Sequence, residues 1–509
     1  MMKIKRFLRR PTVRLAALAV LAWTFFQPCS LWSYELGEKV HKYTLDNGLR
    51  VLMLERPASP TVSIYIRHRV GAVDELNGST GAAHFLEHMM FKGTQTIGTK
   101  NYAAEKELLG KIMAVGDRLD REKRKLAAAD QKKIALLKAS LGELEKKHRK
   151  LVSSNEIDRL YTAEGAVGLN ASTGQDVTTY QVSLPANKLE LWARIEADRM
   201  QNPVFREFYT ERDVVMEERR QSVESDPEGK LMEQFLAASF QAHPYGRPIL
   251  GWPSDMEFLN PKYIGEFFRL YHAPNNTVIT IVGGMDARAT LRLIKKYFGG
   301  LKRQALPPLH ITDEPPQNGE RRIEVVFPAR PQLIIGYHKP TLPSLDDYVF
   351  DVIENILSQG RTSRLYKTIV ESRGLAESVQ TANGFPGARF PNLFVFFATP
   401  RGAHTTGELE EAIYQEVEKL QHEAVTKEEL AKTHNQLKAD FVRGLASNAG
   451  LASKLSYYEI IAGDYHYLSD YLKVMEKITP EDIIRVARKY LVKENRTVAT
   501  LVNSKPADN

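Results

Sequence analysis

Residues 81–91 read Gly81-Ala82-Ala83-His84-Phe85-Leu86-Glu87-His88-Met89-Met90-Phe91, and the rest of the chain is organised around them. The segment contains no proline and has apolar residues around every polar one, so the pattern predicts a helix. His84 and His88 are four residues apart and therefore project from one helical face, one turn from each other. Two imidazole nitrogens in this arrangement can reach a single metal ion. Glu87 lies beside that face, where it can act on a metal-bound water instead of binding the metal.

The length and composition describe a folded protein with more than one domain. A chain of 509 residues is too long for a single core. Hydrophobic residues make up 43% of the sequence, so the chain can bury sizeable cores. Its 70 basic and 62 acidic residues leave a net charge of +8, which is mild for this length. No nucleic-acid-binding motif accompanies this charge, so we expect no nucleic-acid partner.

Residues 1–33 are typical of a secretory signal peptide. Lysine and arginine residues between positions 3 and 14 precede an apolar run, residues 15–26, that is short for a full membrane span. Cleavage near Ser30 or Ser33 would remove Cys29, the single cysteine, and one cysteine excludes an intrachain disulfide in any case. We therefore expect a periplasmic or otherwise exported protein. An uncleaved membrane anchor is the alternative.

Two similar domains are predicted, over residues 40–298 and 322–503. Residues 299–321 lose periodicity and gain four prolines, which is typical of a linker. Residues 261–271 near the end of the first domain resemble residues 480–490 near the end of the second, and each stretch precedes a buried strand, so we infer an internal duplication. The other predicted strands are residues 41–45, 49–54, 61–69, 168–184, 323–327 and 332–337, and the predicted helices include residues 189–200 and 211–224.

Residues 103–160 interrupt the first domain with a stretch rich in Ala, Glu, Lys, Leu and Arg. Heptad-like spacing predicts an antiparallel helical hairpin over residues 103–126 and 131–152. The hairpin is either a docking surface or a solvated insertion with no separate function. We expect deletion of residues 111–153 to leave a folded domain, because a helical hairpin can bury its apolar seam on itself.

A catalytic zinc ion needs a third protein ligand besides two histidines, with one position left for water. Glu211, Glu217 and Glu218 are candidates on the predicted helix 211–224. Glu211 and Glu218 are two turns apart on one face, whereas Glu217 points about 100° away. From composition alone, a run of Glu and Arg on a helix is more typical of a solvated surface than of a metal site.

The sequence from Gly81 to Thr94 closely resembles the active-site segment of the pitrilysin/insulinase family of zinc peptidases, and above all its processing-peptidase branch. The order H-x-x-E-H is the inverted zincin signature. The resemblance implies an α+β fold with two similar domains, each an antiparallel sheet with helices packed on one face, and the helical hairpin as a long insertion in the first. In the family, a glutamate on a helix that begins Glu-Arg-x-Val-Val, here from Glu211, completes the zinc site. The implied roles are one zinc ion per chain on His84, His88 and Glu218, Glu87 as general base, Glu211 as a catalytic support that does not bind zinc, and Asn170 and Ala171 on an edge strand that pairs with extended peptide substrates.

The resemblance predicts a zinc-dependent metalloendopeptidase that hydrolyses peptides or unfolded protein segments. The alternative is a non-catalytic structural or assembly subunit of a peptidase-like complex, although family members with that role usually lack the His/Glu/His set. Related peptidases also carry an Arg and a Tyr, seven residues apart, that grip the substrate. Val370 and Glu377 occupy those positions here, and Arg373 and Tyr366 lie nearby at the wrong spacing. We therefore expect a dimer, in the first place a heterodimer with a similar chain that lacks the zinc motif, and otherwise a homodimer with a rearranged clamp.

Overall fold

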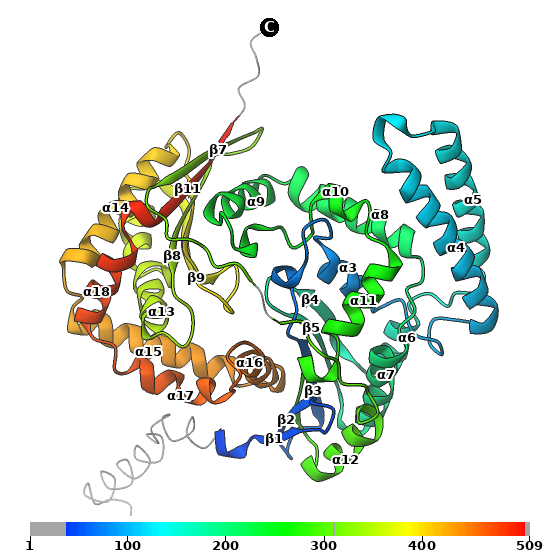
Figure 1. The fold of residues 1–509 in the computed structure, drawn as a ribbon. Helices are drawn as coiled ribbons and strands as arrows, with labels where there is room; N and C mark the ends of the chain where they lie inside the picture. The colour runs from blue at the N-terminus through cyan, green and yellow to red at the C-terminus, as the bar shows by residue number, and fades with distance from the viewer. Residues whose placement is uncertain (1–36, 309–310, 504–509) are drawn as a thin grey trace, which may run out of the picture.

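The computed structural model describes residues 37–308 and 311–503, which form two halves, each built on one β-sheet (Figure 1). We call residues 37–308 the first half and residues 311–503 the second half. The predicted signal peptide, residues 1–33, lies outside the described residues. Among the helices of the described residues, none is long and apolar enough to cross a membrane.

The first half contains a six-stranded sheet with the order β1-β2-β6-β3-β5-β4. The turn at Asn47-Gly48 joins β1 to β2, as the sequence predicts. Its strands are β1 (His41–Thr44), β2 (Arg50–Glu55), β3 (Thr61–His68), β4 (Val167–Thr173), β5 (Thr178–Pro185) and β6 (Thr277–Gly283). Its helices are α3 (Ala82–Met89), α4 (Tyr102–Lys123), α5 (Gln131–Arg149), α6 (Glu156–Ala163), α7 (Leu189–Gln201), α8 (Phe208–Arg219), α9 (Pro227–Ser239), α10 (Pro253–Met256), α11 (Pro261–Tyr271) and α12 (Ala287–Phe298).

The second half repeats this topology with a five-stranded sheet of order β7-β11-β8-β10-β9. Apart from β1, the strands of the two sheets correspond one to one in chain order and in position. The expectation of an α+β fold with two similar domains is therefore confirmed. The strands are β7 (Arg321–Phe327), β8 (Gln332–Lys339), β9 (Ala376–Phe385), β10 (Asn392–Pro400) and β11 (Arg496–Asn503), and the helices are α13 (Leu345–Ser358), α14 (Thr406–His422), α15 (Lys427–Gly444), α16 (Asn448–Ile461), α17 (His466–Met475) and α18 (Pro480–Tyr490).

Two details of the sheets differ from the sequence prediction. Neither sheet is wholly antiparallel, because β2 runs parallel to β6 and β7 runs parallel to β11. The strand predicted over residues 168–184 is two antiparallel strands, β4 and β5, joined by a turn in which Gly174 N–H donates to the carbonyl of Val177. Gly174 and Asp176 are residue types that favour such a turn.

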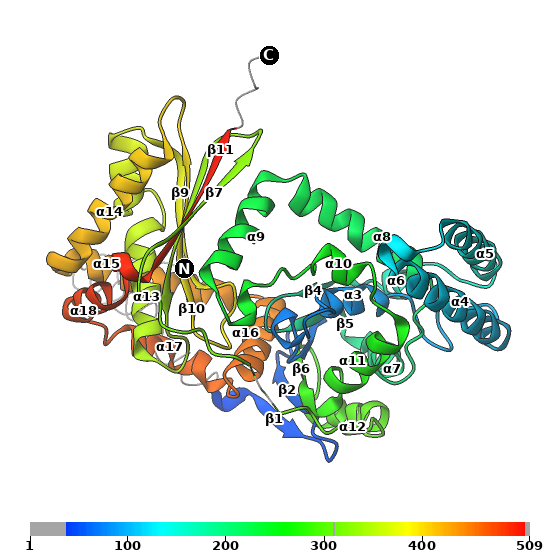
Figure 2. The same cartoon turned by 45° about the horizontal axis from the view of Figure 1, so that its top comes forward.

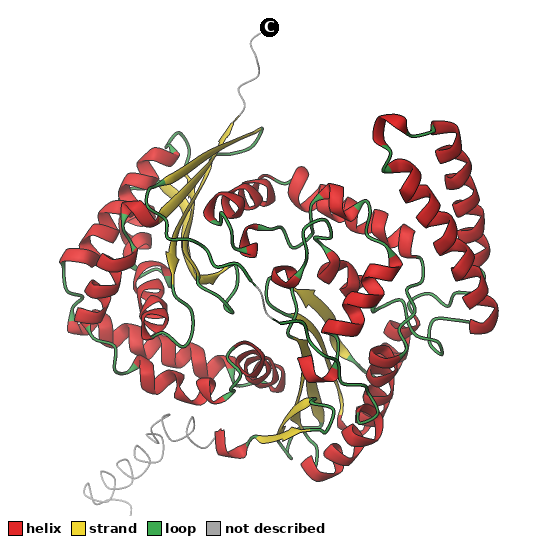
Figure 3. Ribbon diagram, viewed as in Figure 1, coloured by secondary structure: helices red, strands yellow, loops and turns green. Residues whose placement is uncertain are grey.

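Each sheet is covered on both faces, and one cover comes from the other half (Figures 2 and 3). Helices α3, α7, α11 and α12 pack on one face of the first sheet, and α16 from the second half packs on the opposite face. In the same way α13, α14 and α18 cover one face of the second sheet, and α9 from the first half covers the other. The prediction of helices on a single face thus holds only for the helices of the same half. The exchange of α9 and α16 joins the two halves through buried apolar surface.

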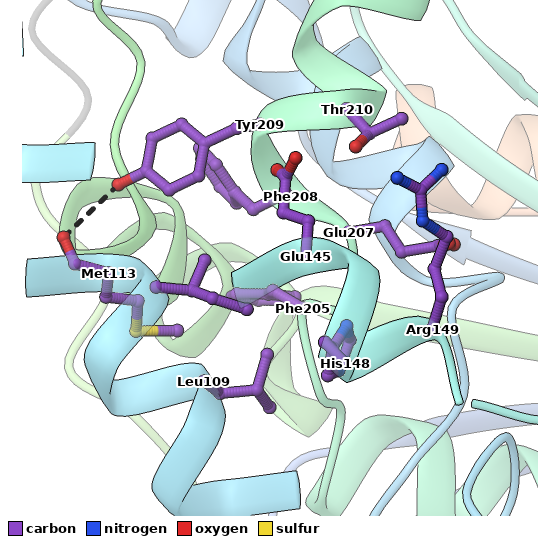
Figure 4. A pocket seen from close by; sticks show the side chains of 11 residues that line it. Leu109, Met113, Glu145, His148, Arg149, Phe205, Glu207, Phe208, Tyr209 and Thr210 are labelled. Carbon is purple, nitrogen blue, oxygen red and sulfur yellow. Dashed lines mark hydrogen bonds between the residues drawn. The ribbon is translucent and has the colours of Figure 1, made fainter. Parts of the chain in front are cut away.

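The predicted hairpin, now α4 and α5, packs on the core of the first half as well as on itself. An added Cβ at Gly116 of α4 would lie 2.0 Å from the ring of Tyr209 of α8, so the two helices meet at van der Waals distance there. Figure 4 shows this contact region, where the Tyr209 hydroxyl points to the Met113 carbonyl. The Arg212 guanidinium donates to both carboxylate oxygens of Asp120 at 2.9 and 3.1 Å, and both side chains are buried.

We therefore expect deletion of residues 111–153 to give aggregated protein, in contrast to the prediction from the sequence alone. The deletion removes Asp120 and leaves Arg212 as a buried unpaired charge, which costs about 3–5 kcal/mol of folding free energy. Size-exclusion chromatography and thermal melting check this result. Leu126→Ser at the hairpin tip is the control, since Leu126 is 78% exposed, and it should melt like the wild type. A soluble deletion variant with a cooperative transition would show that the hairpin is separable.

Candidate metal centre

Helix α3 carries the two histidines, and a glutamate outside the helix holds its first turn. The residue before the helix, Gly81, has φ of 87° and no side chain to cap the free N–H groups. The buried carboxylate of Glu75 supplies the cap instead, because it accepts hydrogen bonds from the N–H groups of Gly81 and Ala83, both at 2.7 Å. Burial raises the pKa of Glu75 to about 8, against the effect of these two bonds. Glu75 thus fixes the start of the helix, at Ala82, two residues before His84.

The structure brings His84 and His88 of α3 together with Glu218 of α8. Nε2 of His84 lies 3.7 Å from one carboxylate oxygen of Glu218, and Nε2 of His88 lies 3.5 Å from the other. Packing of the two helices sets this approach, with the Phe85 and Phe208 rings edge to face at 4.8 Å between centroids. Burial, with the nearby His88 as a second cause, lowers the pKa of His84 to about 4. His84 is therefore neutral at pH 7, as a metal ligand must be.

Glu211 holds the far side of the His88 ring. Nδ1 of His88 donates to Oε1 of Glu211 at 2.9 Å, and Nζ of Lys92 lies 2.6 Å from Oε2 of the same carboxylate. Burial raises the pKa of Glu211, but the bonds to His88 and Lys92 outweigh it and leave the pKa at about 2. For His88, burial lowers the pKa, and the bond and charge of Glu211 outweigh it, so the pKa is raised. This pairing turns Nε2 of His88 towards Glu218.

Glu87 lies next to the cluster without joining it. Its Oε2 accepts a 2.6 Å hydrogen bond from the hydroxyl of Thr173, the last residue of β4. Burial raises the pKa of Glu87 above its usual value, and the Thr173 bond opposes this shift. The carboxylate is therefore oriented by the edge strand and not by the residues that surround His84 and His88.

Asn170 and Ala171 lie on β4, which is an edge strand of the first sheet. They pair with Gln181 and Tyr180 of β5 on one side of the strand. Asn170 is exposed and Ala171 is half-buried. An edge strand offers its remaining N–H and C=O groups to another extended chain.

The donor set fits a zinc ion. Two imidazole nitrogens and one carboxylate oxygen lie within 4.8 Å of one another at His84, His88 and Glu218. Ligand bonds of 2.0–2.2 Å in a tetrahedral site separate the ligand atoms by about 3.4 Å, close to the distances between Glu218 and the two histidines. Three protein ligands also leave the fourth position that a catalytic site needs. Glu217, the competing candidate, is exposed and accepts hydrogen bonds from Arg220 and Gln221 in the segment that follows α8.

Sequence reasoning missed three residues that support the site, namely Glu75, Lys92 and Thr173. Lys92 lies just beyond the predicted helix of residues 81–91, and only the folded structure places its ammonium group against Glu211. Thr173 follows the Asn170 segment by three residues, but only the three-dimensional structure places its hydroxyl against Glu87. Glu75 lies six residues before Gly81 and matches no local capping pattern.

The two positions that match the family's substrate clamp, Val370 and Glu377, differ in residue type and in solvent exposure. Val370 is 7% exposed and packs in the core of the second half. Glu377 lies on the edge strand β9 and forms an exposed ion pair with Arg330 at 3.1 Å. Arg373 donates to Gln415 at 3.2 Å. Val370 and Glu377 therefore do not supply an Arg–Tyr pair.

Family models and known proteins agree with this arrangement. The model of insulinase (peptidase family M16) matches residues 50–123 and 146–252, and its gap falls within the hairpin. The model of the peptidase M16 inactive domain matches residues 259–437. Together these matches cover more than half of the chain.

Curated and solved relatives span nearly the whole chain. The chain is 26% identical to the zinc protease PqqE of Helicobacter pylori over 92% of its length and 93% of the relative. A crystal structure of a protease from Helicobacter pylori has a TM-score of 0.77 at 25% identity and covers 92% of this chain and 100% of that one. The periplasmic protease PqqL of Escherichia coli shares the fold with a TM-score of 0.66 at 18% identity, and the match covers 92% of this chain but 48% of PqqL. On these findings the chain belongs to the insulinase family, peptidase family M16.

Proposed function

We propose that the chain is a zinc-dependent endopeptidase that hydrolyses peptides or unfolded protein segments. The observation that carries this proposal is the convergence of His84, His88 and Glu218, with the carboxylate of Glu87 beside them. Several relatives are named zinc proteases, which supports the same conclusion. A structural subunit would need none of these four side chains in one place.

The proposed zinc ligands are Nε2 of His84, Nε2 of His88 and the carboxylate of Glu218. A zinc ion held there would supply Lewis-acid chemistry towards a peptide carbonyl and would lower the pKa of water. Glu87 takes the proton from the attacking water and passes it to the leaving amine. Thr173 holds Oε2 of Glu87 at 2.6 Å during these transfers. Glu211 acts as a positioning residue, because its bond to Nδ1 of His88 fixes the tautomer and the ring orientation.

The proposed substrate is an extended peptide that lies along β4. Backbone groups near Asn170 and Ala171 would pair with it, so that recognition depends on main-chain hydrogen bonds more than on one sequence. The strand ends at Thr173, whose hydroxyl contacts Glu87. A peptide that pairs alongside β4 would therefore lie close to Glu87, the proposed general base. We also propose that the protein acts after export, on the basis of the signal-peptide pattern in residues 1–33.

Metal removal tests the proposed function. We expect about one zinc ion per purified chain, loss of cleavage of unstructured fluorogenic peptides after treatment with a chelator, and recovery when zinc is added back. Metal analysis and the cleavage assay are run on the same samples, alone and with the partner chain described below. A protein with no stoichiometric zinc, and no cleavage in either sample, would favour the structural-subunit alternative.

We propose that the active form is a heterodimer in which a similar chain without H-x-x-E-H supplies the substrate clamp. Val370 and Glu377 support this, because neither can act as the clamp Arg or Tyr. PqqL, whose chain is about twice the length of the segment that this protein matches, shows that the fold also occurs within a longer polypeptide.

Activity of the chain alone and after mixing with the candidate partner tests this assembly. We expect at least a tenfold increase in peptide cleavage on mixing, and a 1:1 complex in size-exclusion chromatography. The Glu87→Gln variant mixed with the same partner is the control and should stay inactive, which assigns the catalysis to this chain. Full activity of the chain on its own would end the heterodimer proposal and favour a homodimer.

A further inference from the structure

A loop of the second half is buried in the first half close to the metal helix. This loop, residues 386–391, joins β9 to β10 and carries Arg389. The Arg389 guanidinium donates to both carboxylate oxygens of Asp74, with Nη1–Oδ2 at 2.8 Å and Nη2–Oδ1 at 3.1 Å. The side chains of Arg389 and Asp74 are 1% and 5% exposed. A buried bidentate pair of this kind has a single preferred geometry.

A second aspartate of the first half holds the backbone of the same loop. One carboxylate oxygen of Asp176 accepts hydrogen bonds from the N–H groups of Ala388 at 2.6 Å and Arg389 at 3.1 Å. The other oxygen accepts from the Tyr245 hydroxyl at 2.7 Å. An added Cβ at Gly387 would lie 2.5 Å from the Asp176 carboxylate, so the loop approaches this closely only with glycine there.

Both aspartates are close in sequence to residues that support the metal centre. Asp74 precedes Glu75, whose carboxylate holds the N–H groups of Gly81 and Ala83 at the start of α3. Asp176 follows Thr173 by three residues in the β4–β5 turn, and Thr173 orients Glu87. A displacement of the 386–391 loop would therefore reach both the histidine helix and the general base.

We propose that Arg389 is a positioning residue through which the second half, which has no H-x-x-E-H motif, fixes His84 and Glu87 in the first half. Arg389 does not touch these side chains and acts through Asp74 and the turn at Asp176. The proposal deepens the zinc-peptidase function and rests on it for its metal readout. It predicts that loss of Arg389 loosens the start of α3 and weakens metal binding while the rest of the interface between the halves stays in place.

The chain offers a matched control for a general loss of contact between the halves. Arg50 of β2 donates to the buried carboxylate of Glu459 of α16 at 2.8 Å. This ion pair also joins the two halves, but α16 packs on the face of the first sheet opposite to α3. Arg50→Ala should therefore weaken the interface without an effect on the metal centre.

Hydrogen–deuterium exchange of the metal-free full chain, together with zinc affinity from chelator competition, tests the proposal. In Arg389→Ala we expect faster exchange in peptides that cover residues 72–91 and about a tenfold weaker zinc affinity, the lower end for residues behind a metal ligand. Arg389→Lys should recover part of both effects, because it keeps the charge beside Asp74. Arg50→Ala should show neither. If Arg389→Ala does not fold, Asp74→Asn gives the same comparison with a smaller change.

Wild-type exchange in residues 72–91 of Arg389→Ala would overturn the proposal, as would equal effects of Arg389→Ala and Arg50→Ala. Faster exchange limited to Arg389→Ala supports it even if the wild-type chain binds no zinc. A wild-type chain that binds no zinc would contradict the proposed zinc function and not the role of Arg389. The failure of one proposal can therefore be distinguished from the failure of the other.

Discussion

Glu87→Gln is expected to abolish peptide cleavage while the chain keeps its zinc. A general base of this kind contributes about 10²–10⁴-fold to the rate, and glutamine cannot accept and release a proton. Glutamine has nearly the same shape and its amide oxygen can still accept the hydrogen bond that Thr173 donates at 2.6 Å. The three side chains proposed to hold the metal do not include Glu87. Zinc content and cleavage rate, measured on the same preparation with the partner present, check this prediction.

Thr173→Val serves as a companion variant for Glu87→Gln. It removes the hydroxyl that orients Glu87 but leaves the carboxylate, so we expect a smaller loss of rate and unchanged zinc. Normal turnover by Glu87→Gln would remove Glu87 from the mechanism. Loss of zinc from the same variant would show that Glu87 is a ligand, which the present geometry does not support.

The elements nearest to the metal helix could be predicted because their signals are local. In helix α3 and strands β2 and β3, the spacing of apolar residues within each short segment is enough to predict the secondary structure. The repeat of the α11–β6 unit in α18–β11 could be found because both helices begin with Pro and end with Tyr over the same length, and each precedes a buried strand. These local signals were sufficient to predict two similar domains.

The helices that pack on the sheet of the opposite half could not be predicted in the same way. Helix α16 is apolar enough to be buried, but nothing in its sequence says that it packs on the sheet of the other half. The same holds for α9, which leaves the first half to cover the second sheet. The turn between β4 and β5 was missed because Thr and Val continue the strand composition on both sides of Gly174.

The hairpin illustrates how a correct helix prediction can give a wrong packing prediction. Its apolar spacing predicted a seam between α4 and α5, which exists. Gly116 inside a long helix was the available signal for close contact with another element, here the Tyr209 ring. Asp120 and its buried partner Arg212 are 92 residues apart in the sequence, so the pair could not be recognised before the fold was known.

Glu218→Ala is expected to remove stoichiometric zinc from the chain while the protein stays folded. Loss of a direct ligand should weaken zinc binding by more than the 10–100-fold that is typical when a residue behind a ligand is lost. The Glu218 side chain is 42% exposed, so its removal creates no buried cavity and we expect little change in the melting temperature. Metal analysis after gel filtration and chelator competition measure the effect.

Glu217→Ala is the matched control, since Glu217 is the adjacent residue on α8 and pairs with Arg220 at the surface. We expect it to keep one zinc ion per chain and wild-type cleavage. Zinc retained by Glu218→Ala and lost from Glu217→Ala would exchange the two assignments and require α8 to rotate by about 100°. Such a rotation would also break the bond between Glu211 and His88, because Glu211 lies on the same helix face as Glu218. The position of Glu211 in the structure therefore favours Glu218 as the third ligand.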